Sequence, residues 1–250
     1  MINILNSNEF NKMKWVKSLN DAAWKLNFLD INQILEKTVY LNSNQSKEIL
    51  DLITITNGKL FSGKGLELGA GAALFSSTIS KIPDVEKIYS LEIIENYVKL
   101  LQPKIIEKFG IKEKVIPTLG SYDDLSYFED EYFDFIFQYD AFHHADDLPK
   151  VLSECHRVLK KNGILISIDR VQSDRITNAM IDRKLQIVYS KDYFDKHLKE
   201  YLENYKRKDN GEHEIKRKEW ILYLKNAKFK NIKIKNYINY NFKSFIKLIL

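Results

Sequence analysis

Residues 63–76, GKGLELGAGAALFS, decide the fold class of this chain. A short apolar strand over residues 65–68 leads into a glycine turn at Gly69, Ala70 and Gly71, and a helix of small and apolar residues opens at Ala72. Glycine adopts positive φ angles and lets a ligand approach the backbone, while a helix start offers unpaired N–H groups. The order of these features predicts a nucleotide-cofactor loop in an α/β fold.

The flanking residues discriminate between two classes of cofactor. Dinucleotide-binding loops follow the pattern G-x-G-x-x-G, whose third glycine allows close packing of helix and strand. Counted from Gly69, that third position holds Leu74, so the pattern fails. An acidic residue, Glu67, instead stands two places before Gly69 and completes the pattern E-x-G-x-G.

With these residues the chain resembles the class I S-adenosylmethionine-dependent methyltransferases, which have a Rossmann-like fold. The resemblance implies that Gly69, Ala70 and Gly71 lie against the methionine part of S-adenosylmethionine. It also implies that Glu67 helps to place the ammonium group of this cofactor, whose product is S-adenosylhomocysteine. Ala73 stands where many members carry a third glycine, which is a mild departure because alanine is also small.

The sequence KIYSL at residues 87–91 predicts a second strand, which Glu92 ends. A carboxylate about 20 residues beyond the glycine turn, at the end of a strand, can accept hydrogen bonds from both hydroxyls of a ribose. Glu92 follows Gly71 by 21 residues. We therefore expect Glu92 to bind the ribose of the cofactor, and the resemblance places Ile93 beside it.

A third predicted strand, residues 114–118, leads to Ser121, Tyr122 and Asp123. Members of the family usually carry an acid at the position of Ser121, where it contacts the adenine amino group. In this chain the contact passes to Asp123 or to the Ser121 hydroxyl, and Tyr122 stacks on the adenine ring. The alternative is a polar turn without a role in binding.

The most hydrophobic strand covers residues 134–137, and its apolar run without alternation predicts burial on both faces. Its carboxyl end carries Gln138, Tyr139, Asp140, His143 and His144. Ligands of open α/β sheets bind at the carboxyl ends of the strands. We therefore expect Gln138 and Tyr139 to contact the cofactor.

The segment around the two histidines resembles small-molecule methyltransferases, and the phosphobase methyltransferases in particular, where the histidine at the spacing of His144 lies in the active site. We expect His144 to be the general base, His143 to be the second candidate and Asp140 to position cofactor or substrate. Alternatively, the histidines cap the next helix. No metal site is expected, because no nearby acid or histidine completes a convincing ligand set.

The predicted fold is α/β, with a doubly wound, mostly parallel sheet of seven strands that closes with an antiparallel C-terminal hairpin. We expect a single methyltransferase domain over residues 1–250, made of a helical N-terminal cap, a cofactor-binding core, a helical insertion on the substrate side, and a closing helix and hairpin. These parts cover residues 1–60, 61–170, 171–219 and 220–250. The cap either packs against the sheet or closes over a substrate with Trp15, Trp24 or Tyr40.

Several residues in and before the insertion are candidates for binding an anionic group such as a phosphate. They are Arg170, Arg175, Arg183, Tyr193 and His213. Arg170 follows Asp169 directly at the ligand edge, so an internal ion pair between the two is the alternative.

Composition places limits on the partners. The net charge is +5, but lysine, asparagine and isoleucine are all abundant, which indicates a general compositional bias, so no nucleic acid is expected. The N-terminus lacks the features of a signal peptide and no long apolar run occurs, so we expect a cytoplasmic protein without membrane contact, as a monomer or homodimer. The lone Cys155 excludes an intrachain disulfide and is expected in the core.

The functional hypothesis is methyl transfer from S-adenosylmethionine to an oxygen of a small metabolite, with phosphorylated or sugar-like acceptors such as surface-polysaccharide or headgroup precursors in view. N-methylation of a small molecule and methylation of rRNA or tRNA are the alternatives within the family. An NAD-dependent enzyme and a cofactor-binding subunit without activity are the alternatives outside it.

Overall fold

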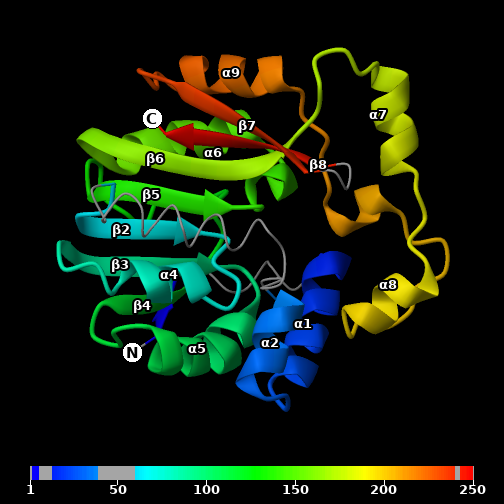
Figure 1. Ribbon diagram of the computed structural model, residues 1–250, viewed down its shortest axis with the longest axis horizontal. Helices are drawn as coiled ribbons and strands as arrows, with labels where there is room; N and C mark the ends of the chain where they lie inside the picture. The colour runs from blue at the N-terminus through cyan, green and yellow to red at the C-terminus, as the bar shows by residue number, and fades with distance from the viewer. Residues whose placement is uncertain (1, 6–12, 39–59, 240–242, 250) are drawn as a thin grey trace.

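A computed structural model describes residues 2–5, 13–38, 60–239 and 243–249. Its described strands form one sheet in the order β1-β4-β3-β2-β5-β6-β8-β7 (Figure 1). The bounds are β1 Asn3–Ile4, β2 Gly63–Leu68, β3 Val85–Glu92, β4 Val115–Leu119, β5 Phe133–Tyr139, β6 Leu159–Val171, β7 Lys233–Asn239 and β8 Lys243–Ile249. Neighbours from β1 to β6 pair in parallel, whereas β8 pairs antiparallel with both β6 and β7.

The strand count differs from the prediction, because eight strands rather than seven are present among the described residues. The additional strand, β1, consists of two residues that pair with Thr118 and Leu119 at the edge of the sheet. Its two residues fell in a segment that we expected to be helical, and a strand this short has no periodicity to reveal it. Residues 240–242, which join β7 to β8, lie outside the described residues, as does Tyr40.

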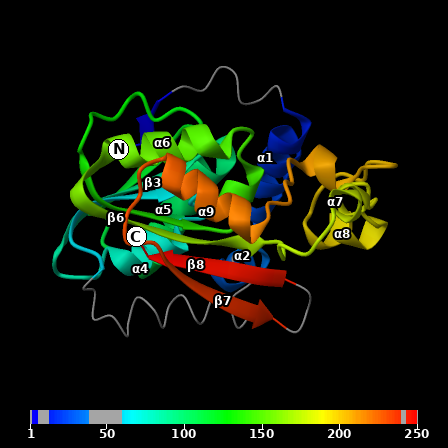
Figure 2. The same ribbon diagram turned by 90° about the horizontal axis from the view of Figure 1, so that it is seen from above.

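Helices cover both faces of the sheet (Figure 2). Their bounds are α1 Lys14–Leu26, α2 Ile31–Thr38, α4 Leu74–Ile79, η2 Tyr97–Leu101, α5 Gln102–Phe109, η3 Phe142–His144, α6 Leu148–Val158, α7 Asn178–Leu185, α8 Lys191–Lys196, η4 Arg207–Asn210 and α9 Arg217–Asn226. The first face packs against α1, α2, α4 and α5, and the second against α6 and α9. None of the helices among the described residues is long and apolar enough to cross a membrane.

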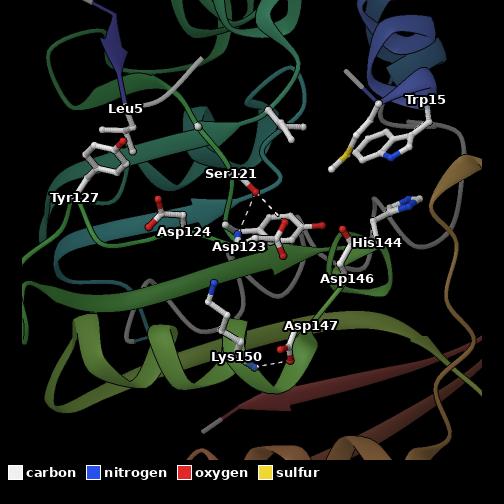
Figure 3. A pocket seen from close by; sticks show the side chains of 14 residues that line it. Leu5, Trp15, Ser121, Asp123, Asp124, Tyr127, His144, Asp146, Asp147 and Lys150 are labelled. Atoms are coloured by element: carbon white, nitrogen blue, oxygen red, sulfur yellow. Dashed lines mark hydrogen bonds between the residues drawn. The ribbon is translucent and has the colours of Figure 1, made fainter. Parts of the chain in front are cut away.

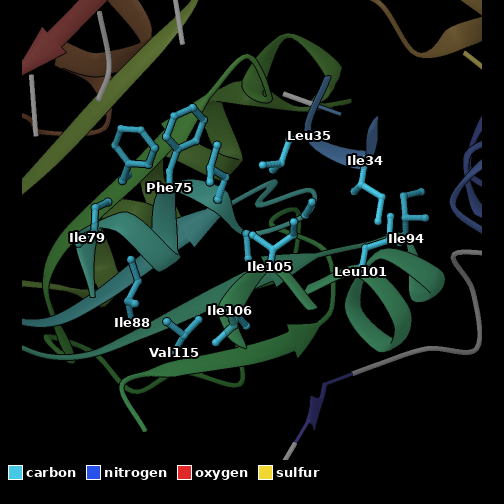
Figure 4. Close-up of a cluster of buried hydrophobic side chains, with 14 of the residues drawn as sticks. Ile34, Leu35, Phe75, Ile79, Ile88, Ile94, Leu101, Ile105, Ile106 and Val115 are labelled. Atoms are coloured by element: carbon cyan, nitrogen blue, oxygen red, sulfur yellow. The ribbon is translucent and has the colours of Figure 1, made fainter. Parts of the chain in front are cut away.

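The core on the first face is a layer of branched and aromatic side chains. Ile34 and Leu35 of α2 lie in the same cluster as Phe75 of α4, Ile105 of α5 and Ile88 of β3 (Figure 4). All five are buried. Cys155 is buried in the cluster on the second face, as predicted. Burial on both faces explains why β5 carries a continuous apolar run.

The strand order reverses between the neighbouring strands β2 and β5. Strands β2, β3 and β4 follow one another outward in one direction, after which β5 returns to the other side of β2 and β6 continues away from it. Such a reversal opens a crevice at the carboxyl ends of the two central strands. The glycine turn after β2 and the histidine segment after β5 therefore meet at this crevice.

Two backbone features in the first half follow from particular residues. Pro103 stands in the first turn of α5, directly after the π-helical segment η2, so the α-helix restarts where proline lacks an N–H to donate. Ala73, at the N-cap of α4, has a left-handed backbone with φ of 62°. The prediction that alanine is a mild departure was incomplete, because this position demands a conformation, not only a small side chain.

Helix α6 passes directly into a strand. It ends at Val158, and β6 begins at Leu159 and includes residues 160–163. Asn162 takes the left-handed conformation with φ of 69°, so the irregularity lies inside the strand. The pairing of β5 with β6 shifts register at the same place, between Phe133 and Phe135.

Candidate active site

The glycine turn presents an open backbone surface at the carboxyl edge. Gly69 and Gly71 have φ angles of 66° and 51°. A Cβ on Gly69 would lie 2.5 Å from that of Ala141, so a side chain would collide with the loop after β5. A Cβ on Gly71 would meet no atom within 4 Å. The turn is therefore packed on one side and free on the other, as a loop that admits a ligand must be.

Glu92 holds this turn in place from the end of β3. Its two carboxylate oxygens accept hydrogen bonds from the backbone N–H groups of Gly71 (2.8 Å) and Ile94 (2.9 Å). Burial raises the pKa of Glu92, while the same N–H donors favour the charged form and oppose the shift. Glu92 thus connects the second strand to the glycine turn, which gives the spacing of 21 residues a structural reason.

Glu67 points away from the crevice. It is 2% exposed and accepts hydrogen bonds from the backbone N–H (2.8 Å) and the hydroxyl of Ser76 in α4. Burial raises its pKa to about 8, and the Ser76 bonds counteract this only in part. Glu67 therefore joins β2 to α4 in this structure, and its role toward the ammonium group of the cofactor stays a prediction.

A pocket of about 440 Å³ opens beside the turn that follows β4 (Figure 3). Its lining is Leu5, Met13, Trp15, Ile93, Gly120, Ser121, Tyr122, Asp123, Asp124, Tyr127, His144, Asp146, Asp147 and Lys150. Trp15 and His144 stand at one end of the pocket, and Leu5 and Tyr127 at the other. The pocket thus combines five residues predicted to bind cofactor or substrate with residues from the N-terminal segment. The five are Ile93, Ser121, Tyr122, Asp123 and His144.

Asp123 is a candidate acceptor for an adenine amino group. Its Oδ2 receives a hydrogen bond from the Ser121 hydroxyl (2.9 Å), whereas its buried Oδ1 has no partner within the described residues. A buried carboxylate oxygen without a donor is costly unless a ligand supplies one. Of the two alternatives for this contact, Asp123 therefore fits better than the hydroxyl of Ser121, which is already engaged. The Tyr122 hydroxyl donates to the carbonyl of Ala141 (2.9 Å), which fixes its ring beside the pocket.

His143 is buried and held by Asp169 of β6. The distance from its Nδ1 to Oδ1 of Asp169 is 2.7 Å, and Oδ2 of the same carboxylate accepts from the backbone N–H of Phe142 (2.7 Å). Burial lowers the pKa of His143, but the charges of Asp169 and Asp140 and the hydrogen bond to Asp169 together outweigh it, and the net shift is upward. Because His143 is 1% exposed and does not line the pocket, it is a positioning candidate rather than a base.

His144 lines the pocket and is held by two contacts. Its Nδ1 lies 2.9 Å from the carbonyl oxygen of Gly211, and its ring stacks on that of Trp15 at 5.9 Å between centroids. Burial, with a smaller contribution from the neighbouring His143, lowers the pKa of His144 to about 3. His144 is therefore neutral at physiological pH, with one ring nitrogen committed to the carbonyl of Gly211.

Comparisons with known proteins agree with this architecture. Residues 66–167 match a family model described as a methyltransferase domain. The chain therefore contains a methyltransferase domain, and its fold is that of the class I S-adenosylmethionine-dependent methyltransferases. The matched residues include the glycine turn, Glu92, Asp123 and both histidines.

Three similar proteins place this methyltransferase among its relatives. It is 33% identical over 171 residues to the uncharacterized protein MJ1123 of Methanocaldococcus jannaschii. The aligned residues make up 68% of this chain and 66% of that protein. It is 37% identical over 65 residues to the glycine/sarcosine/dimethylglycine N-methyltransferase of Actinopolyspora halophila, covering 26% of this chain and 11% of that protein. Its fold resembles that of phosphoethanolamine N-methyltransferase 2 of Haemonchus contortus, solved with phosphomonomethylethanolamine and S-adenosylhomocysteine. The TM-score is 0.58 at 14% identity, and the superposition covers 93% of this chain and 46% of that chain.

Three predicted site residues of the methyltransferase bind other protein groups. Gln138 is buried, donates to the hydroxyl of Ser167 and accepts from the N–H of Ala141 (3.1 Å), so it braces the loop after β5. Tyr139 packs its ring against Phe75, at 5.3 Å between centroids. Asp140 binds the guanidinium of Arg170 through two bonds of 2.7 and 2.8 Å. Their predicted contacts to cofactor or substrate stay predictions.

The expected anion-binding residues do not gather in one place. Arg170 is engaged by Asp140 and by Glu212, which realises the alternative of an internal ion network, although Asp169 itself binds His143. Arg175 and Arg183 are exposed around α7, Tyr193 stacks on Tyr189 and His213 is exposed near Asp146. None of these five candidates lines the pocket.

The reason given against a metal site was wrong in one respect. The structure does bring acids to the histidines, since ligand atoms of His143, His144 and Glu212 lie within 4.8 Å of one another. Sequence distance concealed this, because Glu212 belongs to the insertion. Glu212 is, however, bound by Arg170 (2.7 Å) and Arg207 (3.0 Å), so its charge is compensated by two cations.

Sequence reasoning missed Gln102, which supports the glycine turn. It is fully buried, donates to the carbonyl of Gly71 (2.9 Å) and accepts from the Ser90 hydroxyl (2.9 Å). The signal available was a polar residue directly before Pro103, at the start of a helix whose other inward positions are apolar. This signal is weak because most such glutamines face solvent.

Proposed function

We propose that this methyltransferase transfers the methyl group of S-adenosylmethionine to a small molecule bound in the pocket beside Trp15 and His144. The observation that carries the proposal is the position of this pocket, which shares Ile93, Ser121 and Asp123 with the predicted cofactor region and ends at His144. Cofactor and acceptor would then occupy one continuous cavity. Its volume of about 440 Å³ is in the range of small-molecule sites.

S-Adenosylmethionine supplies a methyl group on a positively charged sulfur, so the main task of the protein is to align the acceptor and exclude water. Such positioning contributes roughly 7 to 11 kcal/mol to a reaction barrier. In this chain Glu92 would hold the ribose, Asp123 would accept from the adenine amino group and the open side of Gly71 would receive the chain of the cofactor. The fit rests on the unpartnered Oδ1 of Asp123 and on the empty space where Gly71 lacks a Cβ.

An oxygen acceptor would donate its hydroxyl hydrogen to His144. Because Nδ1 of His144 is bound to the carbonyl of Gly211, the ring nitrogen that can receive this hydrogen bond is Nε2. A histidine with a pKa of about 3 is a weak base at neutral pH, because efficient bases have a pKa near the working pH. His144 therefore suits the orientation of an acceptor better than the full removal of its proton.

An amine acceptor is the second candidate, and the charge of the pocket favours it. Four of the lining residues are aspartates, namely Asp123, Asp124, Asp146 and Asp147, against one lysine, Lys150. With Trp15 and Tyr127 in the same lining, the pocket suits a small cation or amine, because aromatic faces and carboxylates both attract positive charge. The same charges oppose a phosphorylated acceptor and an RNA backbone. An amine acceptor also agrees with two similar proteins, the glycine/sarcosine/dimethylglycine N-methyltransferase and phosphoethanolamine N-methyltransferase 2, which are both N-methyltransferases.

The test is a set of acceptors that differ in one group. Purified protein would receive radiolabelled S-adenosylmethionine with ethanolamine, ethylene glycol or phosphoethanolamine, and S-adenosylhomocysteine formation would be followed. We expect the amine or the alcohol to increase turnover over the rate without acceptor, and phosphoethanolamine to be the poorest. A clear preference for the phosphorylated compound would contradict the electrostatic argument. Tight cofactor binding without turnover in a wide acceptor screen would instead support a cofactor-binding subunit.

A further inference from the structure

The turn at the end of η4 reaches from the insertion into the active site. Gly211 follows η4 with a left-handed φ of 70°, and its carbonyl oxygen lies 2.9 Å from Nδ1 of His144. A backbone carbonyl can only accept a hydrogen bond. Nδ1 of His144 must therefore carry the hydrogen, which leaves Nε2 as the unprotonated nitrogen of the neutral ring.

We propose that this turn of the insertion is a positioning element of the active site, in which Gly211 fixes the tautomer of His144 and Glu212 anchors the turn to the core. The proposal rests on the proposed function only in giving His144 a role toward the acceptor. The matched methyltransferase domain ends at residue 167. Gly211 and Glu212 lie beyond it, yet they determine which ring nitrogen of His144, inside the domain, is unprotonated.

The N-terminal helix α1 completes the arrangement. Trp15 stacks on the ring of His144 with an angle of 18° between the planes, and α1 also packs against η4. A Cβ added to Gly211 would lie 3.3 Å from Nε1 of Trp15 and 3.6 Å from Nδ1 of His144. Glycine at this position therefore permits both the left-handed turn and the close approach of the two rings.

Glu212 ties the turn to the carboxyl end of β6. It accepts from Arg170 at 2.7 Å and from Arg207 at 3.0 Å, while the N–H of His213 donates to the carbonyl of His143 (2.9 Å). Burial would raise the pKa of Glu212, but Arg170 and the other cations around it bring it to about 2. The anchor thus stays charged at any pH at which the protein would work.

Three contacts therefore have separate roles in fixing the imidazole of His144. Gly211 decides which nitrogen carries the hydrogen, Trp15 fixes the plane of the ring, and the Arg170–Glu212 pair holds the turn. The pocket-lining segments before residue 167 cannot do this alone, because no other hydrogen bond to a ring nitrogen of His144 occurs among the described residues. A change in the insertion should therefore alter His144 without touching the cofactor region.

The test is NMR of the imidazole nitrogens in ¹⁵N-labelled protein, with the His144 signals assigned by their loss in His144→Gln. We expect the wild type to show the Nδ1–H tautomer for His144. In Gly211→Ala the ratio of the two tautomers should change by roughly tenfold, as the loss of one hydrogen bond implies. Glu212→Gln, which keeps the shape and removes the charge, should cause a smaller change in the same direction.

Two controls separate the possible failures. Met180→Ala, at an exposed position of α7 in the same insertion, should leave the His144 signals unchanged. Binding of S-adenosylhomocysteine, measured by calorimetry, should be unaffected in all these variants. A wild type with the Nε2–H tautomer, or a tautomer ratio in Glu212→Gln and Gly211→Ala that equals that of Met180→Ala, overturns the positioning role. Absence of cofactor binding in the wild type would instead overturn the proposed function.

Discussion

The cofactor end and the acceptor end of this crevice are built in different ways. At the cofactor end, Glu67, Gly71 and Glu92 come from one β-α-β unit, and their contacts are mostly with backbone N–H groups of the same unit. At the acceptor end, Trp15, His144 and Glu212 come from the N-terminal helix, the loop after β5 and the insertion. The first end is specified by local spacing, whereas the second exists only when distant segments meet.

Two buried glutamates show the physical side of this difference. Glu67 is surrounded by neutral donors, and burial raises its pKa to about 8. Glu212 is also buried, but the neighbouring arginines lower its pKa to about 2. Hydrogen bonds from neutral groups compensate burial in part, whereas paired cations overcompensate it. The acceptor end is therefore fixed by charge, and the cofactor end by backbone geometry.

The largest effect should come from removing the carboxylate that we place on the ribose. Glu92→Ala should weaken the binding of S-adenosylmethionine by about 1,000-fold, because two charge-assisted hydrogen bonds are lost and the support of Gly71 goes with them. Isothermal titration calorimetry measures this, with Glu95→Ala as the control at a neighbouring glutamate that forms an ion pair with Lys99. Unchanged affinity in Glu92→Ala would remove the local unit from cofactor binding.

At the acceptor end, His144→Ala should lower turnover by about 100-fold, because the acceptor loses its orientation, and should leave cofactor affinity nearly intact. The exposed His213 provides the control His213→Ala. Since the pKa of His144 in the folded protein is about 3, the ring stays neutral, and the pH dependence of turnover should contain no titration of His144 between pH 5 and 8. A loss of cofactor affinity equal to the loss of turnover would show that the two ends are not separable.

Glu67 gives a prediction about stability and pH. Its folded pKa of about 8 lies above the ordinary value of 4.5, so the stability that it contributes is complete below pH 4.5 and is lost as pH rises through 8. Between pH 5 and 8 the free energy of unfolding of the wild type should fall by more than about 1 kcal/mol relative to Glu67→Gln. Urea titrations at several pH values measure this, with Glu86→Gln at an exposed site as the control. Parallel curves for wild type and Glu67→Gln would contradict the raised pKa.

The smallest effect concerns the strained turn itself. Ala73→Gly should change the free energy of unfolding by less than about 0.5 kcal/mol, because relief of the left-handed strain offsets the loss of a buried methyl group and of chain entropy. Ala23→Gly, at an equally buried position in the interior of α1, gains no such relief and should cost about 1 to 2 kcal/mol. Equal losses in the two variants would show that Ala73 carries no strain.

The fold class could be predicted from short segments of the sequence. Residues 65–71 and Glu92 indicated the cofactor class because a glycine turn and a strand-end carboxylate act through the backbone of their own β-α-β unit. The apolar residues before Gln138 indicated the central strand, because a strand that is buried on both faces carries few polar residues. Strand β1 was missed because two residues have no sequence period, and α4 begins at Leu74 rather than at Ala72 because Ala73 has a left-handed backbone.

Sequence by itself determined the order of elements, the class of cofactor and the candidate histidines, because these depend on spacing within a few turns of the chain. Only the tertiary structure decided which histidine lines the pocket, that Glu67 faces Ser76, and that Glu212 stands beside His143. The sign of a pKa shift depends on burial and on charges that lie within a few ångströms in space. Residues 170 and 212 become such neighbours only after the insertion has folded back onto the sheet.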